Sequence, residues 1–382
     1  MTFTFVSNYI NHHQQPLCDV LYEKLGDGFS FVATMPMEQE RVDMGWDITL
    51  SELPYVKKLY EDPACEQLIY DSDVVLIGWS EREDIAQKRL NSGKVTLRVS
   101  ERLYREGTYK AVSPRGLIAK YKEHIRYRKD PVFMLCAGAY AAADFNMIHA
   151  YPDKLLKWGY FPPFIEYDHN EIDKRLETAK TKQIIWVGRF IPLKHPEFIV
   201  RLAERLKEEG EDFHIHMVGD GELFEAIKSE VREKVPDEVT LHGSLAADEV
   251  RALMSECHMH ISTSNHLEGW GAVINEGMNS GCIEIACEQM GAVPYLIKDN
   301  ENGLIYPTDV YESMEQVVLR VFRNWHGYTH LGSRGYKTIR DEWNADIAAD
   351  RLLGLTKALL GEGEFTLPES GPLSPAPILR SN

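Results

Sequence analysis

Residues 262–276 of the chain read STSNHLEGWGAVINE. The residues before them, 257–262, have the pattern of a strand, and residues 272–279 have that of a helix. Two glycines, Gly269 and Gly271, lie in the loop between, where the lack of a Cβ lets the backbone come close to a ligand. The amides that open the helix then offer hydrogen-bond donors and a partial positive charge to an anion. This stretch therefore predicts an anion site on an α/β scaffold.

Two carboxylates flank the loop. Glu268 precedes the first glycine, and Glu276 lies about one turn into the helix, where it can reach a hydroxyl beside the anion. Two glutamates at this spacing also occur by chance on helices, so it is their place after a strand that indicates function. A phosphate held by amides, with a carboxylate for hydroxyls on either side, indicates a nucleotide sugar.

The spacing from Glu268 to Glu276 resembles the Glu-x7-Glu signature of retaining family 4 glycosyltransferases. Residues 277–282 (GMNSGC), 291–294 (GAVP) and 302–306 (NGLIY) are also similar to that family. The resemblance implies the GT-B fold, in which two Rossmann-like domains with parallel sheets face each other across a cleft. It also implies a C-terminal helix that crosses back to the N-terminal domain.

The pattern along the chain agrees with this α/β class, because strand and helix segments alternate. Strands are predicted at 2–7, 29–34, 74–78, 95–99, 132–137, 183–188, 213–218, 239–242, 257–262 and 283–286, and helices include 16–25, 53–60, 82–91 and 115–129. We expect an acceptor domain at 1–165, a nucleotide-sugar domain at 166–345 and the crossover helix at 346–360. The Gly-, Pro- and Ser-rich residues 361–382 are predicted to form a flexible tail.

Composition narrows the function classes. The chain has 382 residues, 44% of them hydrophobic, and a formal net charge of −17, which argues against nucleic acid as a partner. Its six cysteines are scattered, as expected for reduced thiols. Neither a signal peptide nor an 18-residue apolar run is evident, so we expect a cytoplasmic protein, with peripheral contact to the inner face of the membrane left open.

A second loop, residues 187–194 (VGRFIPLK), carries two cations five residues apart, Arg189 and Lys194. They can converge on a diphosphate, the arginine through its fork and the lysine as a point charge. The loop resembles the Gly-Arg…Lys element of the family, which implies that both cations neutralise the departing nucleoside diphosphate. The predicted catalytic residues are thus Glu268, Arg189 and Lys194.

Other turns complete the predicted donor site. Residues 218–221 (VGDG) follow a strand but lack the third glycine of a dinucleotide fingerprint, so NAD is not indicated. The resemblance implies that this turn borders the nucleotide and that residues 242–245 (HGSL) read the base through their backbone. The predicted nucleotide-sugar-binding residues are Gly188, Gly219, Gly221, Gly243, Leu245, Gly269, Trp270, Gly271, Ala272, Val273 and Glu276.

The loop after the first strand, residues 8–13 (NYINHH), departs from the Gly-Gly loop of many family members. We therefore predict acceptor contacts for Asn11, His12 and His13, with residues 100–102 (SER) as a similar candidate.

No metal or other cofactor is expected. The pairs His214/His216 and His258/His260 each lie on one face of a strand, and no carboxylate evidently completes a site.

Charge is unevenly distributed. Between Arg82 and Lys129 there are fourteen Lys and Arg against five acids. The predicted helix from Arg115 to Lys129 places Leu117, Ile118, Tyr121 and Ile125 on one side among these cations. Such a helix is either an ordinary amphipathic surface helix or a contact to a membrane surface.

Together these features predict a retaining, metal-independent glycosyltransferase. It would move a hexosyl unit from a UDP- or GDP-linked sugar to a hydroxyl of a glycan or lipid-linked glycan, in bacterial surface-polysaccharide biosynthesis. Two alternatives stay open: a GT-B nucleotide-sugar epimerase or hydrolase, and a non-catalytic protein that binds nucleotides or glycans.

Overall fold

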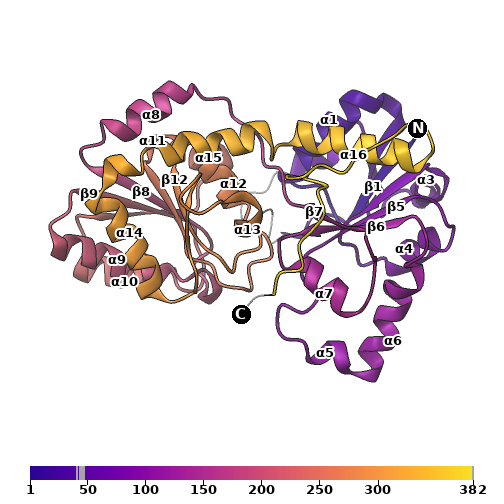
Figure 1. Cartoon of the computed structure of the whole chain (residues 1–382), viewed down its shortest axis with the longest axis horizontal. Helices are drawn as coiled ribbons and strands as arrows, with labels where there is room; N and C mark the ends of the chain where they lie inside the picture. The colour runs from indigo at the N-terminus through magenta and orange to yellow at the C-terminus, as the bar shows by residue number, and fades with distance from the viewer. Residues whose placement is uncertain (40–41, 43–47, 381–382) are drawn as a thin grey trace. The chain divides into compact units, whose positions relative to one another are not determined.

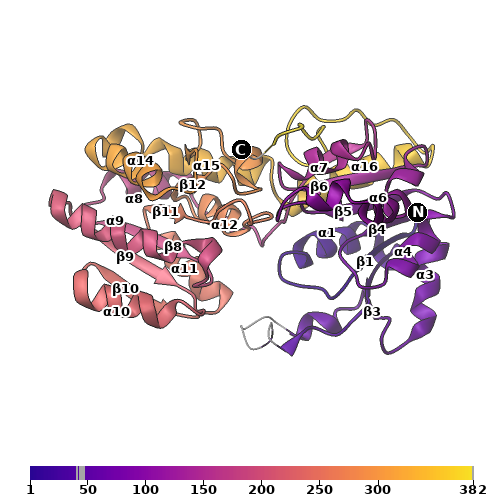
Figure 2. The ribbon, with the colours of Figure 1, turned by 90° about the horizontal axis from the view of Figure 1, so that it is seen from below.

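The computed structural model describes residues 1–39, 42 and 48–380, and the chain forms two compact units (Figure 1). Unit 1 contains Met1–Pro163 and Glu342–Asn382, and unit 2 contains Phe164–Asp341. Each unit is built on one parallel sheet with helices packed around it, which confirms the predicted α/β class (Figure 2). No helix among the described residues is long and apolar enough to cross a membrane.

Unit 1 has a seven-stranded sheet in the order β3-β2-β1-β4-β5-β6-β7. Its strands are β1 (Phe3–Ser7), β2 (Phe29–Ala33), β3 (Val56–Lys58), β4 (Val74–Ile77), β5 (Thr96–Ser100), β6 (Val132–Ala137) and β7 (Leu155–Trp158). Every residue of β1 is buried, as is typical of a central parallel strand with helices on both faces. The order of strands reverses between β1 and β4, and ligands of open α/β sheets bind at the carboxyl ends of strands at such a point.

The helices of unit 1 are α1 (Gln15–Leu25), α3 (Glu66–Asp71), α4 (Glu83–Leu90), α5 (Tyr109–Val112), α6 (Pro114–Glu123), α7 (Ala141–Met147) and α16 (Ala345–Leu359). Short 3₁₀ turns lie at Gly26–Gly28, Ile48–Glu52, Pro63–Cys65 and Ile125–Tyr127. α16 packs against α1, where Asp350 pairs with Lys24 at 2.8 Å. The chain thus returns to unit 1 after completing unit 2.

Two helix predictions differ from the structure. The predicted helix at 53–60 is wrong, because Val56–Lys58 pair with Phe31–Ala33 of β2 and hydrogen bonding to that neighbour outweighs the local pattern. The predicted helix at 115–129 ends at Glu123. There His124 turns into the core, and its Nδ1 lies 2.8 Å from the hydroxyl of Tyr151.

The C-terminal segment also differs from its prediction as a flexible tail. Leu373 and Ser374 are fully buried, and Pro375 forms an antiparallel bridge with Leu156 of β7. The amide of Leu373 donates to the carbonyl of Lys157 at 2.8 Å. β7 is an edge strand, so it has backbone groups that no neighbouring strand pairs. The C-terminal segment hydrogen-bonds to these groups although its composition is polar.

Unit 2 has a six-stranded parallel sheet in the order β10-β9-β8-β11-β12-β13. Its strands are β8 (Lys182–Val187), β9 (Phe213–Val218), β10 (Val239–Gly243), β11 (Met259–Ser262), β12 (Ile283–Cys287) and β13 (Leu304–Tyr306). Its helices are α8 (His169–Glu177), α9 (Pro196–Glu209), α10 (Phe224–Lys234), α11 (Ala247–Glu256), α12 (Val273–Asn279), α13 (Val293–Leu296), α14 (Tyr311–Arg323) and α15 (His330–Asp341), with 3₁₀ turns at Pro192–Lys194 and Trp325–Gly327. The strand order reverses between β8 and β11, the two strands that lead into the predicted donor loops.

The docking of the C-terminal segment predicts a stability effect. Leu373→Ala should destabilise unit 1 by about 2–5 kcal/mol, because it truncates a fully buried side chain and leaves a cavity while the backbone stays in place. Leu367→Ala, at a side chain that is 37% exposed, is the matched control and should have little effect. Urea unfolding of both variants measures the difference, and equal midpoints would show that the segment contributes no packing.

Candidate functional site

The loops after β8 and β9 lie directly against each other in unit 2. The amide of Gly188 donates to the carbonyl of Val218 at 3.0 Å, and that of Phe190 donates to Asp220 at 2.9 Å. A Cβ on Gly219 would lie 2.0 Å from the Gly188 oxygen, and Gly219 has a φ of +128°. Gly219 is therefore needed for packing of the two loops, whatever ligand they hold.

The loop after β8 is also fastened to the loop after β11. The hydroxyl of Thr263 donates to the carbonyl of Lys194, and the buried indole of Trp186 donates to that hydroxyl at 2.8 Å. The amide of Asn265 donates to the carbonyl of Leu193 at 3.0 Å. These contacts hold the cation-bearing loop beside the glutamate-bearing loop.

The predicted catalytic residues come together here. The ammonium of Lys194 and the carboxylate of Glu268 form an ion pair, with side chains only 14% and 18% exposed. Burial alone would raise the pKa of Glu268, but the charge of Lys194, a hydrogen bond from Ser264 and the charge of Arg189 outweigh it, so the pKa is lowered. Glu268 is thus held ionised, and the exposed Arg189 lies within electrostatic range of it.

Glu276 lies on α12 and is half-buried. Burial raises its pKa, and the charges of Arg251 and His260 partly oppose that rise. Its environment therefore differs from that of Glu268, which has a lysine in contact.

Beneath α12 lies a buried pair that the sequence did not predict. His260 of β11 and Glu284 of β12 are register partners, both fully buried, with His260 Nδ1 2.8 Å from the carboxylate. The sequence analysis considered this histidine only as a candidate metal ligand and did not identify Glu284 as its partner. A Cβ on Gly277 would lie 2.5 Å from Glu284 Oε2, so only glycine fits above the pair. No group of three or more His, Cys, Asp or Glu is placed to hold a metal ion within the part of the chain that the structure describes.

The other predicted donor-site residues differ in whether their side chains or only their backbone can contact a ligand. The indole of Trp270 is buried and donates to the Asn275 side chain at 2.9 Å, so it holds the loop rather than facing a ligand. Leu245 packs against the core cluster that contains Ile185 and Val218. Trp270 therefore leaves only its backbone for binding, whereas Leu245 and Val273 are partly exposed. Ala272 has a small side chain, and no side chain stands between the backbone and a ligand at Gly188, Gly221, Gly243, Gly269 and Gly271.

Sequence reasoning missed His195, which follows Lys194. Its φ is +45°, its ring stacks on Phe198 at 4.7 Å, and its Nδ1 lies 2.9 Å from the carboxylate of Glu197. A non-glycine residue in the left-handed region before Pro196 fixes the turn from the cation loop into α9.

The predicted acceptor residues lie at a cavity of unit 1 of about 810 Å³, at the carboxyl ends of β1, β4, β5, β6 and β7. Asn11 and His13 line it, and the Asn11 side chain accepts from the His13 amide at 3.0 Å. His12 is not among the lining residues, and its ring packs on that of His13 at 3.9 Å. Burial and the neighbouring His12 lower the pKa of His13 to about 3, so its imidazole is neutral. Ser100, Glu101 and Arg102 line the same cavity.

Comparison with known proteins adds to this geometry. Residues 168–338 match the family model described as glycosyl transferases group 1. Poly(ribitol-phosphate) α-N-acetylglucosaminyltransferase of Staphylococcus aureus is 21% identical over 178 residues, which are 46% of this chain and 36% of that enzyme. The chain thus spans about a third of the length of this curated relative.

Solved structures share the fold. HepE of Anabaena in complex with UDP has a TM-score of 0.69 at 12% identity, covering 94% of this chain and 100% of that one. The pneumococcal O-GlcNAc transferase GtfA in complex with UDP and GlcNAc has a TM-score of 0.67 at 11% identity, covering 94% and 99%. These are GT-B proteins, so the predicted fold class is confirmed. The predicted family is confirmed as well: residues 168–338, nearly the whole of unit 2, belong to glycosyl transferases group 1.

Proposed function

We propose that this protein is a retaining hexosyltransferase that uses a nucleoside-diphosphate sugar, with UDP as the first candidate nucleotide, and needs no metal. The observation that carries the proposal is the ion pair of Lys194 and Glu268, with Arg189 beside it, at the carboxyl edge of the unit 2 sheet. The family of unit 2 and the UDP complexes of its structural relatives support it.

The chemistry follows from what these groups can do. When the bond from the anomeric carbon to the phosphate oxygen breaks, negative charge grows on the diphosphate. Arg189 and Lys194 stabilise that charge, each donor contributing about 2–4 kcal/mol in the transition state. As Lys194 turns to the diphosphate, Glu268 becomes available to hold sugar hydroxyls, and Glu276 binds the ribose. The family resemblance implies that the acceptor oxygen attacks from the face of departure and that its proton passes to the leaving phosphate.

The acceptor is assigned to the cavity of unit 1. In this proposal Asn11 and the neutral His13 supply hydrogen-bonding groups there, whereas His12, which does not line the cavity, packs its ring on that of His13. A cavity of this size holds one or two sugar units.

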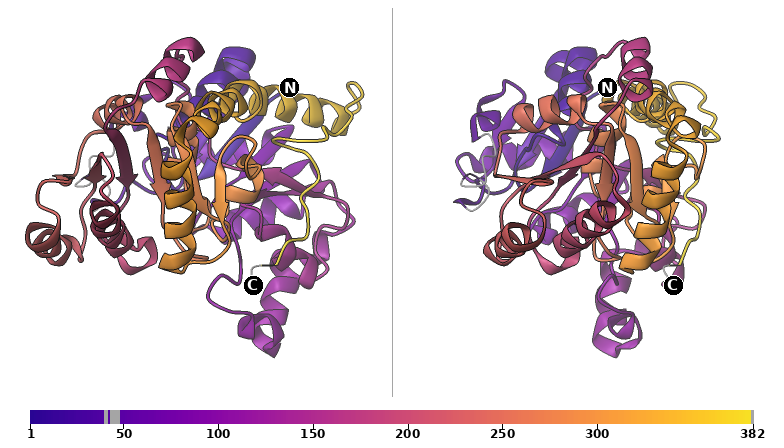
Figure 3. Two further views of the ribbon diagram at one scale, coloured as in Figure 1. Left: turned by 60° about the vertical axis from the view of Figure 1, so that its left-hand side comes forward. Right: turned by 90° about the vertical axis from the view of Figure 1, so that its left-hand side faces the viewer.

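We also propose a peripheral membrane contact through α6, which suits a lipid-linked acceptor. Leu117, Ile118 and Tyr121 are 45%, 59% and 58% exposed, and no described residue of the helix is buried. An ordinary amphipathic helix would turn this stripe to the core, yet only Ile125 of the predicted stripe packs there. Arg115, Lys122, Arg126, Arg128 and Lys129 are exposed around it. Figure 3 shows this helix projecting from the rest of unit 1.

The epimerase or hydrolase alternative remains a second candidate. It would consume the nucleotide sugar without an acceptor, whereas a transferase needs one.

The ion pair predicts the effect of two substitutions on transfer. Glu268→Ala should abolish sugar transfer, and Lys194→Ala should lower it by about 10²–10³-fold, because each removes a group used at the reacting centre. Release of nucleoside diphosphate in the presence of a membrane glycan extract measures this. Glu225→Ala, which removes an exposed carboxylate 3.0 Å from Lys228, is the control. Unchanged turnover of Glu268→Ala would refute the assignment.

The donor site predicts selective thermal stabilisation. At a hundred times its Kd, a UDP-sugar should stabilise the native protein by about 2.7 kcal/mol and raise Tm, with GDP- and dTDP-sugars as the comparison panel. Arg189→Ala should weaken the effect, whereas Arg201→Ala, which breaks an exposed pair with Glu312, should not. A Tm shift that survives Arg189→Ala and Lys194→Ala together would place the nucleotide elsewhere.

The α6 surface predicts binding to anionic vesicles. The protein should float with vesicles that contain phosphatidylglycerol but not with pure phosphatidylcholine, since each basic residue near such a surface contributes about 1 kcal/mol. Ile118→Glu should abolish flotation because it places an acid in the apolar stripe. Val310→Glu, at a residue of unit 2 that is 49% exposed, is the matched control. Equal flotation of the two variants would exclude α6 as the contact.

A further inference from the structure

Trp79 gives the unit 1 cavity an aromatic surface that takes no part in the proposed donor chemistry. Trp79 follows β4, lines the cavity and is 64% exposed. Its backbone is nevertheless fixed, because its carbonyl accepts from the Asn8 amide at 2.8 Å and from the Ser7 hydroxyl at 3.1 Å. The indole therefore projects into solvent from a rigid base.

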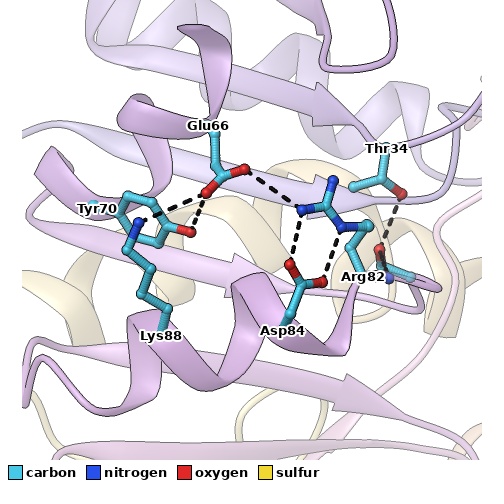
Figure 4. Close-up of polar contacts among 7 residues, drawn as sticks. Thr34, Glu66, Tyr70, Arg82, Asp84 and Lys88 are labelled. Carbon is cyan, nitrogen blue, oxygen red and sulfur yellow. Dashed lines mark hydrogen bonds and ion pairs between the residues drawn. The ribbon is translucent and has the colours of Figure 1, made fainter. Parts of the chain in front are cut away.

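The residues after Trp79 are anchored in turn. The hydroxyl of Thr34 lies 2.9 Å from that of Ser80 and donates to Glu81 at 2.9 Å. Figure 4 shows the contacts of the following residue, Arg82. Its guanidinium donates two hydrogen bonds to Asp84 and forms a longer ion pair with Glu66. A ligand that stacks on Trp79 would thus meet a residue whose backbone is already fixed, and fixing groups in place before binding lowers the entropy cost.

The charges of the cavity are balanced. Among the residues that the structure describes, the lining cations are Arg98, Arg102, Arg105 and Lys120, and the lining carboxylates are Glu83, Glu101, Glu106 and Glu123. Arg98 lies 3.6 Å from Glu83, Arg105 lies 3.6 Å from Glu101, Lys120 pairs with Glu123, and Arg102 lies 3.7 Å from the buried Asp144 behind the wall.

The two histidines that line the cavity add no charge. Burial lowers the pKa of His13 to about 3, and it lowers that of His124 well below its usual value. A phosphate in the cavity would have to compete with a carboxylate for every cation, so the electrostatics disfavour an anion.

We infer that this cavity binds an uncharged pyranose ring of the acceptor, with one face of the ring stacked on Trp79. This inference rests on the proposed function, in which the cavity holds the acceptor. A pyranose offers a flat face of C–H groups to the indole and hydroxyls to groups such as Glu101 and Arg98, whereas an open-chain polyol phosphate offers a charge and no rigid face. The acceptor therefore differs in chemistry from the poly(ribitol-phosphate) that names the S. aureus relative.

The test is ligand binding to the full chain with UDP present in excess. Isothermal titration compares methyl glycosides of glucose, galactose and N-acetylglucosamine with ribitol 5-phosphate and inorganic phosphate. We expect at least one glycoside to bind more tightly than either phosphate. Trp79→Ala should weaken that glycoside about tenfold, the equivalent of about 1.4 kcal/mol of stacking, and Trp79→Phe should retain most of the affinity. Tyr121→Ala removes a ring of similar exposure (58%) outside the cavity and should change nothing.

Tighter binding of either phosphate, no glycoside binding, or an unchanged Kd in Trp79→Ala would overturn the inference. The outcome is separable from the proposed function, because Glu268→Ala lies in unit 2 and should bind the glycoside normally while losing transfer. Loss of transfer in Glu268→Ala without any glycoside binding to the wild type would leave the proposed function standing and remove this inference alone.

Discussion

The ion pair of Lys194 and Glu268 is the interaction on which the account of unit 2 depends. Removing two charges from water costs several kcal/mol per ion, which their mutual attraction often fails to offset, so a largely buried pair is weak evidence for stability. Its place at the switch point of the sheet indicates a different role. Lys194 and Arg189 keep Glu268 ionised, and in the proposed reaction a diphosphate and a sugar would take the place of the pair. The Trp186–Thr263 contact and the glycine-to-glycine packing of the neighbouring loops keep the pair in position.

Unit 1 distributes its charge differently. The basic excess read from the sequence between Arg82 and Lys129 is not spread evenly over the surface. Around the cavity each cation lies beside a carboxylate, whereas on and after α6 exposed cations surround exposed apolar side chains. One segment thus contains both an electrically balanced cavity, where we propose a neutral sugar, and a cationic, apolar surface, where we propose the membrane contact.

The sequence predicted where most strands and loops lie, but it missed contacts that depend on the register of neighbouring strands. The closeness of Lys194 and Glu268 was expected from the family resemblance, and their loops do follow strands that are neighbours in the sheet, β8 and β11. The pairing of His260 with Glu284 depends on the register between β11 and β12, which no local pattern specifies. The helix predicted at 53–60 and the tail predicted at 361–382 failed for a related reason, because both segments gain hydrogen bonds from a sheet edge. The sequence also did not show which way a side chain points, since Trp270 is buried whereas Trp79 is exposed.

A double-mutant cycle on donor affinity tests the central claim most directly. The Kd for the UDP-sugar would be measured for wild type, Lys194→Ala, Glu268→Ala and the double variant. If the pair acts as one unit at the donor, the sum of the two single effects should differ from the effect of the double variant by about 0.5–3 kcal/mol. Effects that add to within about 0.3–0.5 kcal/mol would contradict the account, because independent sites behave in that way.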